Sequence, residues 1–176
     1  MPIKTILNIS LPNITVDSSF TYPHGVGAFI TNLTRNALIK SGYIRNLTEY
    51  TTGFNLNYGE FAQLGNITLD GAAVKGTVSN SSVHDGSSGI IANGASGNTF
   101  RGNVIYKNYY SGIYLWNSSA NNIIESNYLH SNASAGNYNG GVALDSSHSN
   151  TITANLAYSN GWAGIYAYGS SSNTIT

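Results

Sequence analysis

The second half of the chain contains short stretches of alternating hydrophobic and polar residues, each beginning directly after a glycine. In the stretch after Gly112, Ile113 and Leu115 alternate with Tyr114 and Trp116. A period of two sends successive side chains to opposite faces, so the stretch predicts a short β-strand with one buried face. The same arrangement recurs, with the glycines 23, 29 and 23 residues apart, at Gly89-Ile90, Gly141-Val142 and Gly164-Ile165.

Asparagines follow these strands at intervals of five residues, with further apolar positions between them. Each repeat therefore predicts three short strands separated by asparagine corners. An amide at a corner can bond the equivalent amides above and below it, which satisfies turn backbone that would otherwise be buried unpaired. We expect a structural ladder made of Asn98, Asn103, Asn108, Asn122, Asn127, Asn132, Asn150, Asn155, Asn160 and Asn173.

A repeat of this length cannot bury its own hydrophobic face, so neighbouring repeats must stack into one continuous core. The pattern predicts an all-β fold, a single-stranded parallel β-helix (solenoid) with about 23 residues per coil. Parallel crossovers are almost always right-handed, which predicts the hand. The expected inward residues are Ile90, Ala92, Phe100, Ile105, Ile113, Leu115, Ile124, Leu129, Val142, Leu144, Ile152, Ala157, Ile165, Ala167 and Ile175.

The first half is less regular. We expect residues 1–70 to form an N-terminal cap or irregular coils, residues 71–176 to form regular coils, and the whole to be one continuous domain. Counting back from Gly89 predicts that Asn80 and Asp85 occupy corners equivalent to Asn103 and Asn108. We expect strands without a clean period at residues 28–30, 37–39 and 43–44. Residues 5–16 are expected to form an edge or capping strand. Residues 53–64 are expected to form a long loop or irregular coil.

A glycine followed by an alternating apolar pair, and then by N-x-[IF]-x-x-N, runs from Gly89 to Thr176. This pattern resembles the parallel β-helix repeat family, also called carbohydrate-binding and sugar-hydrolase repeats. The family includes pectate-lyase-like enzymes, alginate epimerases and the β-helix protein of nitrous oxide reductase maturation. The resemblance implies the fold and leaves the activity open, because one fold hosts many functions.

The amino-acid composition excludes several classes of partner and site. Only 8% of residues are charged and the formal net charge is zero, so no basic field exists to attract nucleic acid. There are no cysteines, which excludes disulfides and thiolate metal sites. No apolar run approaches the length of a transmembrane helix.

Many N-x-S/T triplets, the acceptors of N-glycosylation, favour an extracellular or cell-surface location. The alternative is that a chain rich in Asn, Ser and Thr produces them by chance. Asn117, in an outward turn, is the expected glycosylation site, whereas Asn80 and Asn132 are expected to be inward and unmodified. The triplets begin at Asn8, Asn13, Asn32, Asn46, Asn66, Asn80, Asn117 and Asn132.

Outward positions of the first strand stack into columns that bring aromatic residues beside a carboxylate. Aromatic faces with a few polar partners suit sugar rings. The candidate carbohydrate-binding residues are Tyr114, Trp116, Asp145, Tyr166 and Tyr168. Two alternatives remain: an aromatic ladder that only stabilises the sheet, and burial against another protein. An insertion of about six residues near 133–139 accounts for the 29-residue spacing.

Catalysis has little support in the sequence. Asp145 lacks an acidic neighbour in the adjacent coils, as a glycosidase would need. The Asp-Pro-His motif of the epimerases is reduced to Pro23-His24, and the four histidines are scattered, so we expect no metal and no cofactor.

We therefore expect a non-catalytic extracellular or cell-surface protein with a structural role. Its partners would be further copies stacked end to end into filaments or side by side, or the rest of a longer solenoid, with polysaccharide contact as a second role. The alternative is a polysaccharide-active enzyme (lyase, epimerase or glycosidase) or a carbohydrate-binding module.

Overall fold

The computed structural model describes the backbone of residues 6–10 and 13–16 and all of residues 37–46, 53–134 and 139–176. The chain divides into two compact units, Met1–Leu33 and Thr34–Thr176. In the first unit, β1 (Ile6–Ser10) pairs antiparallel with β2 (Asn13–Val16). The strand predicted at residues 28–30 lies outside the described residues.

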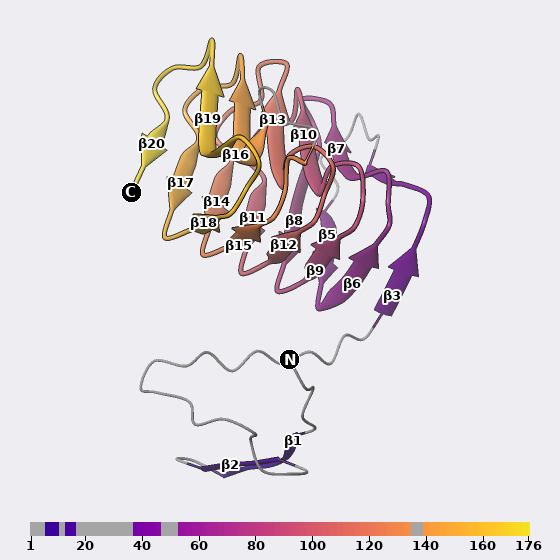
Figure 1. Cartoon of the computed structure of the whole chain (residues 1–176). Helices are drawn as coiled ribbons and strands as arrows, with labels where there is room; N and C mark the ends of the chain where they lie inside the picture. The colour runs from indigo at the N-terminus through magenta and orange to yellow at the C-terminus, as the bar shows by residue number, and fades with distance from the viewer. Residues whose placement is uncertain (1–5, 11–12, 17–36, 47–52, 135–138) are drawn as a thin grey trace. The chain divides into compact units, whose positions relative to one another are not determined.

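The second unit consists of three parallel sheets of six strands each (Figure 1). The first sheet is β4 (Ile44–Asn46), β7 (Ile67–Asp70), β10 (Ile90–Asn93), β13 (Ile113–Trp116), β16 (Gly140–Asp145) and β19 (Ala163–Tyr168). The second sheet is β5 (Gly53–Asn57), β8 (Lys75–Ser79), β11 (Thr99–Arg101), β14 (Ile123–Glu125), β17 (Thr151–Thr153) and β20 (Thr174–Ile175). The third sheet is β3 (Ala37–Lys40), β6 (Gly59–Ala62), β9 (Ser82–His84), β12 (Val104–Tyr106), β15 (Tyr128–His130) and β18 (Leu156–Tyr158).

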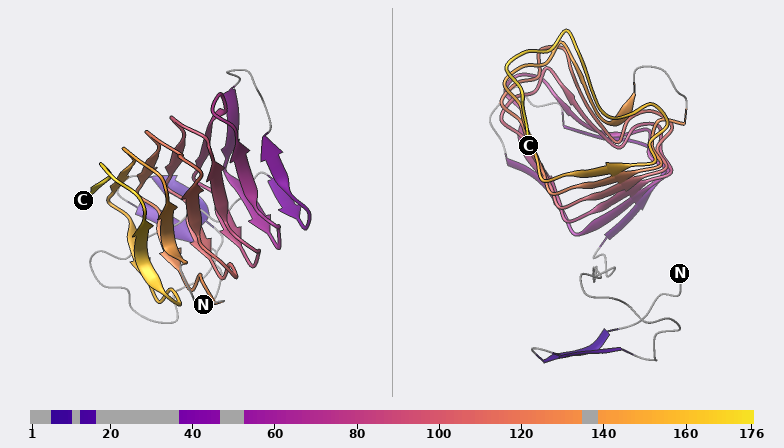
Figure 2. Two further views of the ribbon diagram at one scale, coloured as in Figure 1. Left: turned by 90° about the horizontal axis from the view of Figure 1, so that it is seen from above. Right: turned by 60° about the vertical axis from the view of Figure 1, so that its left-hand side comes forward.

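Each coil contributes one strand to each sheet, and the strands enclose a single core (Figure 2). The predicted parallel β-solenoid is therefore confirmed. The expected inward residues of the middle coils are buried: Phe100, Ile113, Leu115 and Ile124 are all fully inaccessible to solvent. In the last coil, however, Ala167 and Ile175 are exposed, because no described strand covers that end of the sheets.

The asparagines form three hydrogen-bonded columns along the coils. The Asn98 backbone N–H and side-chain amide both donate to Oδ1 of Asn122, at 2.9 and 3.0 Å. The Asn122 amide in turn donates to Oδ1 of Asn150 and to the Ala95 carbonyl, each at 3.0 Å. The second and third columns repeat these bonds through Asn103, Asn127 and Asn155, and through Asn108, Asn132 and Asn160; Asn173 ends the first.

Every ladder asparagine follows a residue in the left-handed backbone region. These preceding residues have φ between 49° and 74°, as at Lys107 (53°) and Ser126 (55°). A single left-handed residue turns the chain sharply and costs about 1–2 kcal/mol when it is not glycine. The bonds made by the following asparagine offset this cost, so the corner depends on the pair rather than on the asparagine alone.

The first coils correct two expectations. Asn80 and Asp85 occupy the left-handed position, with φ of 48° and 54°, and not the ladder position. Ser81 and Gly86 take the ladder places, and their backbone N–H groups donate to Oδ1 of Asn103 and of Asn108, each at 3.1 Å. The count from Gly89 is off by one because the following coil has one residue more between its third corner and its glycine.

Residues 53–64 also differ from the expected loop or irregular coil. They contain β5 and β6, whose register with β8 and β9 pairs Leu56 with Val78 and Phe61 with Val83. Regular stacking therefore reaches back to β3, well before residue 71. The repeat is not recognisable in this part of the sequence because its corner positions are not occupied by the regularly spaced asparagines of the later coils.

The recurring glycine of the first sheet is required by close packing at three of its four positions, Gly89, Gly112 and Gly141. A Cβ on Gly112 would lie 2.7 Å from the carbonyl oxygen of Gly141, and one on Gly89 would lie 2.3 Å from that of Gly112. The backbones of successive coils thus touch directly at this edge, which fixes the register of the first sheet.

Candidate functional site

The outer face of the first sheet carries two columns of side chains in the predicted register. One column pairs Tyr114 with Ala143 and Ala143 with Tyr166. The next pairs Asp145 with Tyr168. On β16, between β13 and β19, the outward residues are Ala143 and Asp145, whose side chains are short. They leave a depression between Tyr114 on β13 and the tyrosines of β19.

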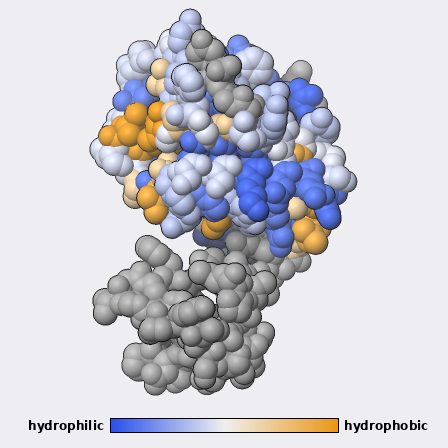
Figure 3. All heavy atoms as spheres, in the orientation of Figure 1, coloured by the Kyte–Doolittle hydropathy of each residue, from blue (hydrophilic) through white to orange (hydrophobic). Residues whose placement is uncertain are grey.

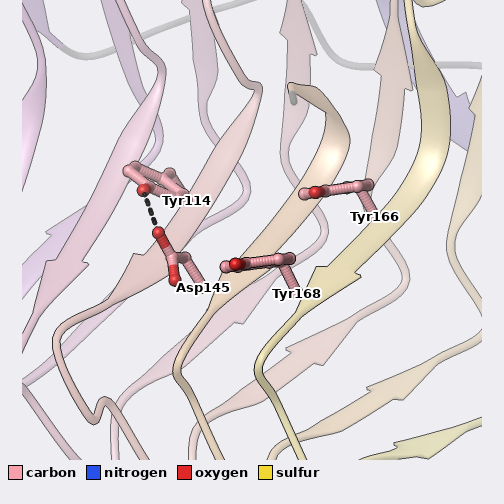
Figure 4. A pocket seen from close by; sticks show the side chains of 4 residues that line it. All are labelled: Tyr114, Asp145, Tyr166 and Tyr168. Atoms are coloured by element: carbon pink, nitrogen blue, oxygen red, sulfur yellow. Dashed lines mark hydrogen bonds between the residues drawn. The ribbon is translucent and has the colours of Figure 1, made fainter. Parts of the chain in front are cut away.

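This depression has a volume of about 380 Å³ and is lined by Tyr114, Asp145, Tyr166 and Tyr168. Ala143 is fully buried, since its methyl group lies between the flanking tyrosines. Tyr114 and Tyr166 project from strands two spacings apart, or about 9.6 Å. In Figure 4 the rings of Tyr166 and Tyr168 lie parallel and point from β19 towards Asp145 and Tyr114.

Asp145 is held in place by two hydroxyl groups. The Tyr114 hydroxyl donates to Oδ2 at 3.3 Å, and the Ser146 hydroxyl donates to Oδ1 at 2.9 Å. Burial, followed by the charge of Asp145, raises the pKa of Tyr114 to about 12, so its hydroxyl stays protonated at physiological pH. The site thus presents one carboxylate, phenol hydroxyls and aromatic ring faces.

Four of the five sequence-predicted site residues meet in this depression, and Trp116 flanks it. The indole of Trp116 is 40% exposed and lies 6.2 Å from the Tyr114 ring with an interplanar angle of 7°. Its register partner on β10 is Asn93. The two parallel rings on β13 extend the aromatic surface along the strand beyond the depression.

A second aromatic array lies on the third sheet. The rings of His84, Tyr106, His130 and Tyr158 stack in sequence, with centroids 4.6, 5.2 and 5.1 Å apart. The repeat pattern alone places Tyr106, His130 and Tyr158 in one column. His84 joins this column only because Ser81, and not Asn80, is equivalent to Asn103. Because each inner ring is covered on both faces by its neighbours, this array offers edges rather than free faces and suits sheet stabilisation.

The two histidines of this array differ in their surroundings. His84 lies between two carboxylates, with Nδ1 2.7 Å from Asp85 and Nε2 3.2 Å from Glu60. Burial, with a smaller effect from Lys107, lowers the pKa of His130 below its ordinary value of 6.5.

The remaining acids do not converge on the depression. Asp70 pairs with Arg45 and accepts a hydrogen bond from the Asn93 amide at 2.8 Å. It lies three strands from Asp145 on the first sheet, or about 14 Å. Glu60 and Asp85 are both hydrogen-bonded to His84, and within the described ranges no group of three His, Asp or Glu side chains is placed so that it could hold a metal ion.

The candidate glycosylation triplets occupy different environments. Asn117 is exposed at an outward turn, and its amide donates to Oδ1 of Asn93 at 3.2 Å. Asn132 is a buried ladder member, as expected. Asn80 is only half-buried at its turn, so the reason for expecting it to be inward is wrong.

The described part of the chain contains no helix of the length and apolarity needed to cross a membrane. No curated protein and no solved structure matches the sequence. The family model of the right-handed β-helix region matches residues 10–176, which confirms the predicted hand and covers nearly the whole chain. The chain therefore belongs to the right-handed β-helix family.

Proposed function

We propose that this protein is a non-catalytic β-helix that binds a glycan in the depression on its first sheet. The observation that carries the proposal is the meeting of Tyr114, Asp145, Tyr166 and Tyr168 from three successive coils. Ring faces provide apolar stacking for a pyranose, and the carboxylate and phenol groups provide hydrogen bonds for its hydroxyls. A rigid sheet holds these groups in place, which lowers the entropic cost of binding.

A polysaccharide-active enzyme is the weaker alternative. Both common glycosidase mechanisms use two carboxylates about 5–9.5 Å apart across the scissile bond. Among the described residues, Asp145 is the only carboxylate that lines the depression, and the other acid of the first sheet, Asp70, is about 14 Å away. Binding without turnover is what a lone carboxylate among aromatic rings supports.

The test is titration with neutral and acidic oligosaccharides, followed by tryptophan and tyrosine fluorescence and by calorimetry. A Tyr166→Ala/Tyr168→Ala variant should lose at least about tenfold in affinity, since stacking and burial of two rings contribute well over 1.4 kcal/mol. Tyr158→Ala is the matched control, because Tyr158 is an exposed aromatic residue on the third sheet, in the coil that precedes β19. Equal losses in both variants, or no binding to any glycan, would contradict the proposal.

A structural role in end-to-end assembly is a second candidate. Each of the three sheets has a terminal strand bonded on one side at each end of the described coils. Apolar side chains are exposed there, Ile39 at 39% and Ile175 at 53%, and Figure 3 shows apolar areas at both ends of a largely polar surface. Such ends are templates for further strands, supplied by another copy or by more of a longer solenoid.

Sedimentation velocity across a range of protein concentrations tests this assembly. Ile175→Lys should reduce the association by placing a charge in the apolar end, whereas Ile123→Lys, at a comparably exposed side position, should not. A single unchanged species at all concentrations would argue against self-association.

We also propose an extracellular or cell-surface location, supported by the exposed triplet at Asn117. Mass spectrometry of glycopeptides from the native source should find sugar on Asn117 and none on the buried Asn132. Sugar on Asn132 would be incompatible with the ladder in the mature protein.

A further inference from the structure

We infer that the depression selects neutral saccharides and rejects acidic ones, so that its ligand class is an uncharged, hydroxyl-rich glycan. This inference rests on the proposed glycan site and concerns which glycans enter it. It is carried by the distribution of charge around Asp145 together with the hydrogen-bonding capacity that Asp145 has left.

Cations are absent from the sequence of the coils that build the site. All seven Lys and Arg residues precede residue 108, and so do five of the seven acids, which leaves residues 108–176 with Glu125, Asp145 and a net charge of −2. The residues that line the depression all lie in this segment. An anionic polymer usually requires Lys or Arg to neutralise its carboxylates.

The described cations lie elsewhere on the solenoid. Lys75 and Arg101 belong to the second sheet, Lys40 to the third, and Lys107 follows β12 of the third. Arg45 is on the first sheet, but it pairs with Asp70 and lies four strands from β16, or about 19 Å. Arg45 is neutralised locally by its pair with Asp70, and at 0.1 M salt its separation from β16 also exceeds the Debye length of about 10 Å, so Arg45 offsets little of the charge of Asp145.

Asp145 is arranged to accept hydrogen bonds from a ligand. A carboxylate offers about four lone-pair positions, and the hydroxyls of Tyr114 and Ser146 use two of them. Two positions remain for ligand hydroxyls. The Tyr114 phenol, with its pKa of about 12, stays neutral and adds no second charge. A neutral sugar supplies donors to such a site, whereas a uronate adds an acceptor that repels it.

The size of the discrimination follows from Coulomb's law. Two unit negative charges about 4 Å apart repel enough to weaken binding roughly fivefold in bulk water, and considerably more at a partly buried protein site. Because salt screens this repulsion, the preference for neutral glycans should shrink as ionic strength rises.

The experiment compares glycans that differ only in oxidation at C6: oligogalactosides against oligogalacturonides, and oligomannosides against oligomannuronates of equal length. Affinities are measured by calorimetry at 20 and 500 mM salt. In at least one pair the neutral member should bind at least about fivefold more tightly at low salt, with a smaller ratio at high salt. Asp145→Asn should bring the ratio close to one, and Asp145→Lys should favour the acidic member.

Glu125→Gln is the control, because it removes the other negative charge of this segment from the second sheet and should leave the ratio unchanged. Acidic glycans that bind as tightly as their neutral partners, or an Asp145→Asn variant with an unchanged ratio, would overturn the selectivity and leave the glycan site standing. Binding of neither series would overturn both.

Discussion

The ladder asparagine Asn122 offers the sharpest test of what holds the coils together. Its side chain is fully buried and makes four hydrogen bonds, accepting two from Asn98 and donating to the Ala95 carbonyl and to Asn150. Asn122→Ala removes all four. Its neighbour Asn121 is exposed and has φ of 54°, which glycine also adopts without strain, so Asn121→Gly is the matched control.

The expected cost of Asn122→Ala comes mainly from the groups left behind. The backbone N–H of Asn98 and the carbonyl of Ala95 lose their partner in a buried place. An unsatisfied buried polar group costs about 1–3 kcal/mol, so two such groups predict a loss of about 4 kcal/mol in the free energy of unfolding. Asn121→Gly should change it by less than about 1 kcal/mol.

Urea unfolding followed by circular dichroism measures the difference. With a slope of about 2 kcal/mol/M, the midpoint of Asn122→Ala should fall by about 2 M, against about 0.5 M or less for Asn121→Gly. Equal shifts for the two variants would refute the view that buried amide columns, rather than apolar packing alone, stabilise the corners.

Three further outcomes follow from contacts described above. Gly112→Ala should destabilise the protein by about 1–3 kcal/mol in urea unfolding, because its Cβ meets backbone at 2.7 Å, whereas Gly164→Ala, with its nearest atom at 3.5 Å, should cost much less; equal costs would contradict direct backbone contact. Since the pKa of His130 is lowered in the folded state, unfolded chains take up protons first as pH falls below 6.5, so acidification should reduce stability; His130→Phe should flatten this dependence, and an unchanged pH profile would count against it. Asp145→Asn should lower the pKa of Tyr114 from about 12 without restoring 10, because burial, the largest single cause, remains; ultraviolet titration of the phenol would detect a failure to shift.

The sequence predicted the fold and the inward residues where each coil carries its own corner marks. The prediction failed at Asn80, which occupies the left-handed position one residue before the ladder position. Asparagine is favourable at both positions, so the residue type does not distinguish them. The positive φ of Asn80 and the hydrogen bond from the Ser81 backbone N–H to Asn103 show that Ser81, not Asn80, takes the ladder place.

The candidate site was predictable in its columns but not in its shape. Register alone places Tyr114, Asp145 and Tyr166 near one another. The depression exists because Ala143 is small and the rings of Tyr166 and Tyr168 point towards Asp145 and Tyr114. The orientation of these rings depends on packing that strand periodicity does not encode. Likewise, the stack of His84 on Tyr106 requires a register that the repeat pattern obscures.

The direction of the amide columns has a mechanical consequence. The hydrogen bonds of the asparagine ladder and those between strands both connect one coil to the next. A force that pulls the chain ends apart would therefore peel away a terminal coil first and break the hydrogen bonds of one coil at a time. The protein should yield coil by coil, and each coil of about 23 residues should release roughly 80 Å of extended chain. Compression along the axis of the solenoid is resisted by all three sheets together. The solenoid should therefore be stiff under compression, and under tension it should extend in steps of one coil.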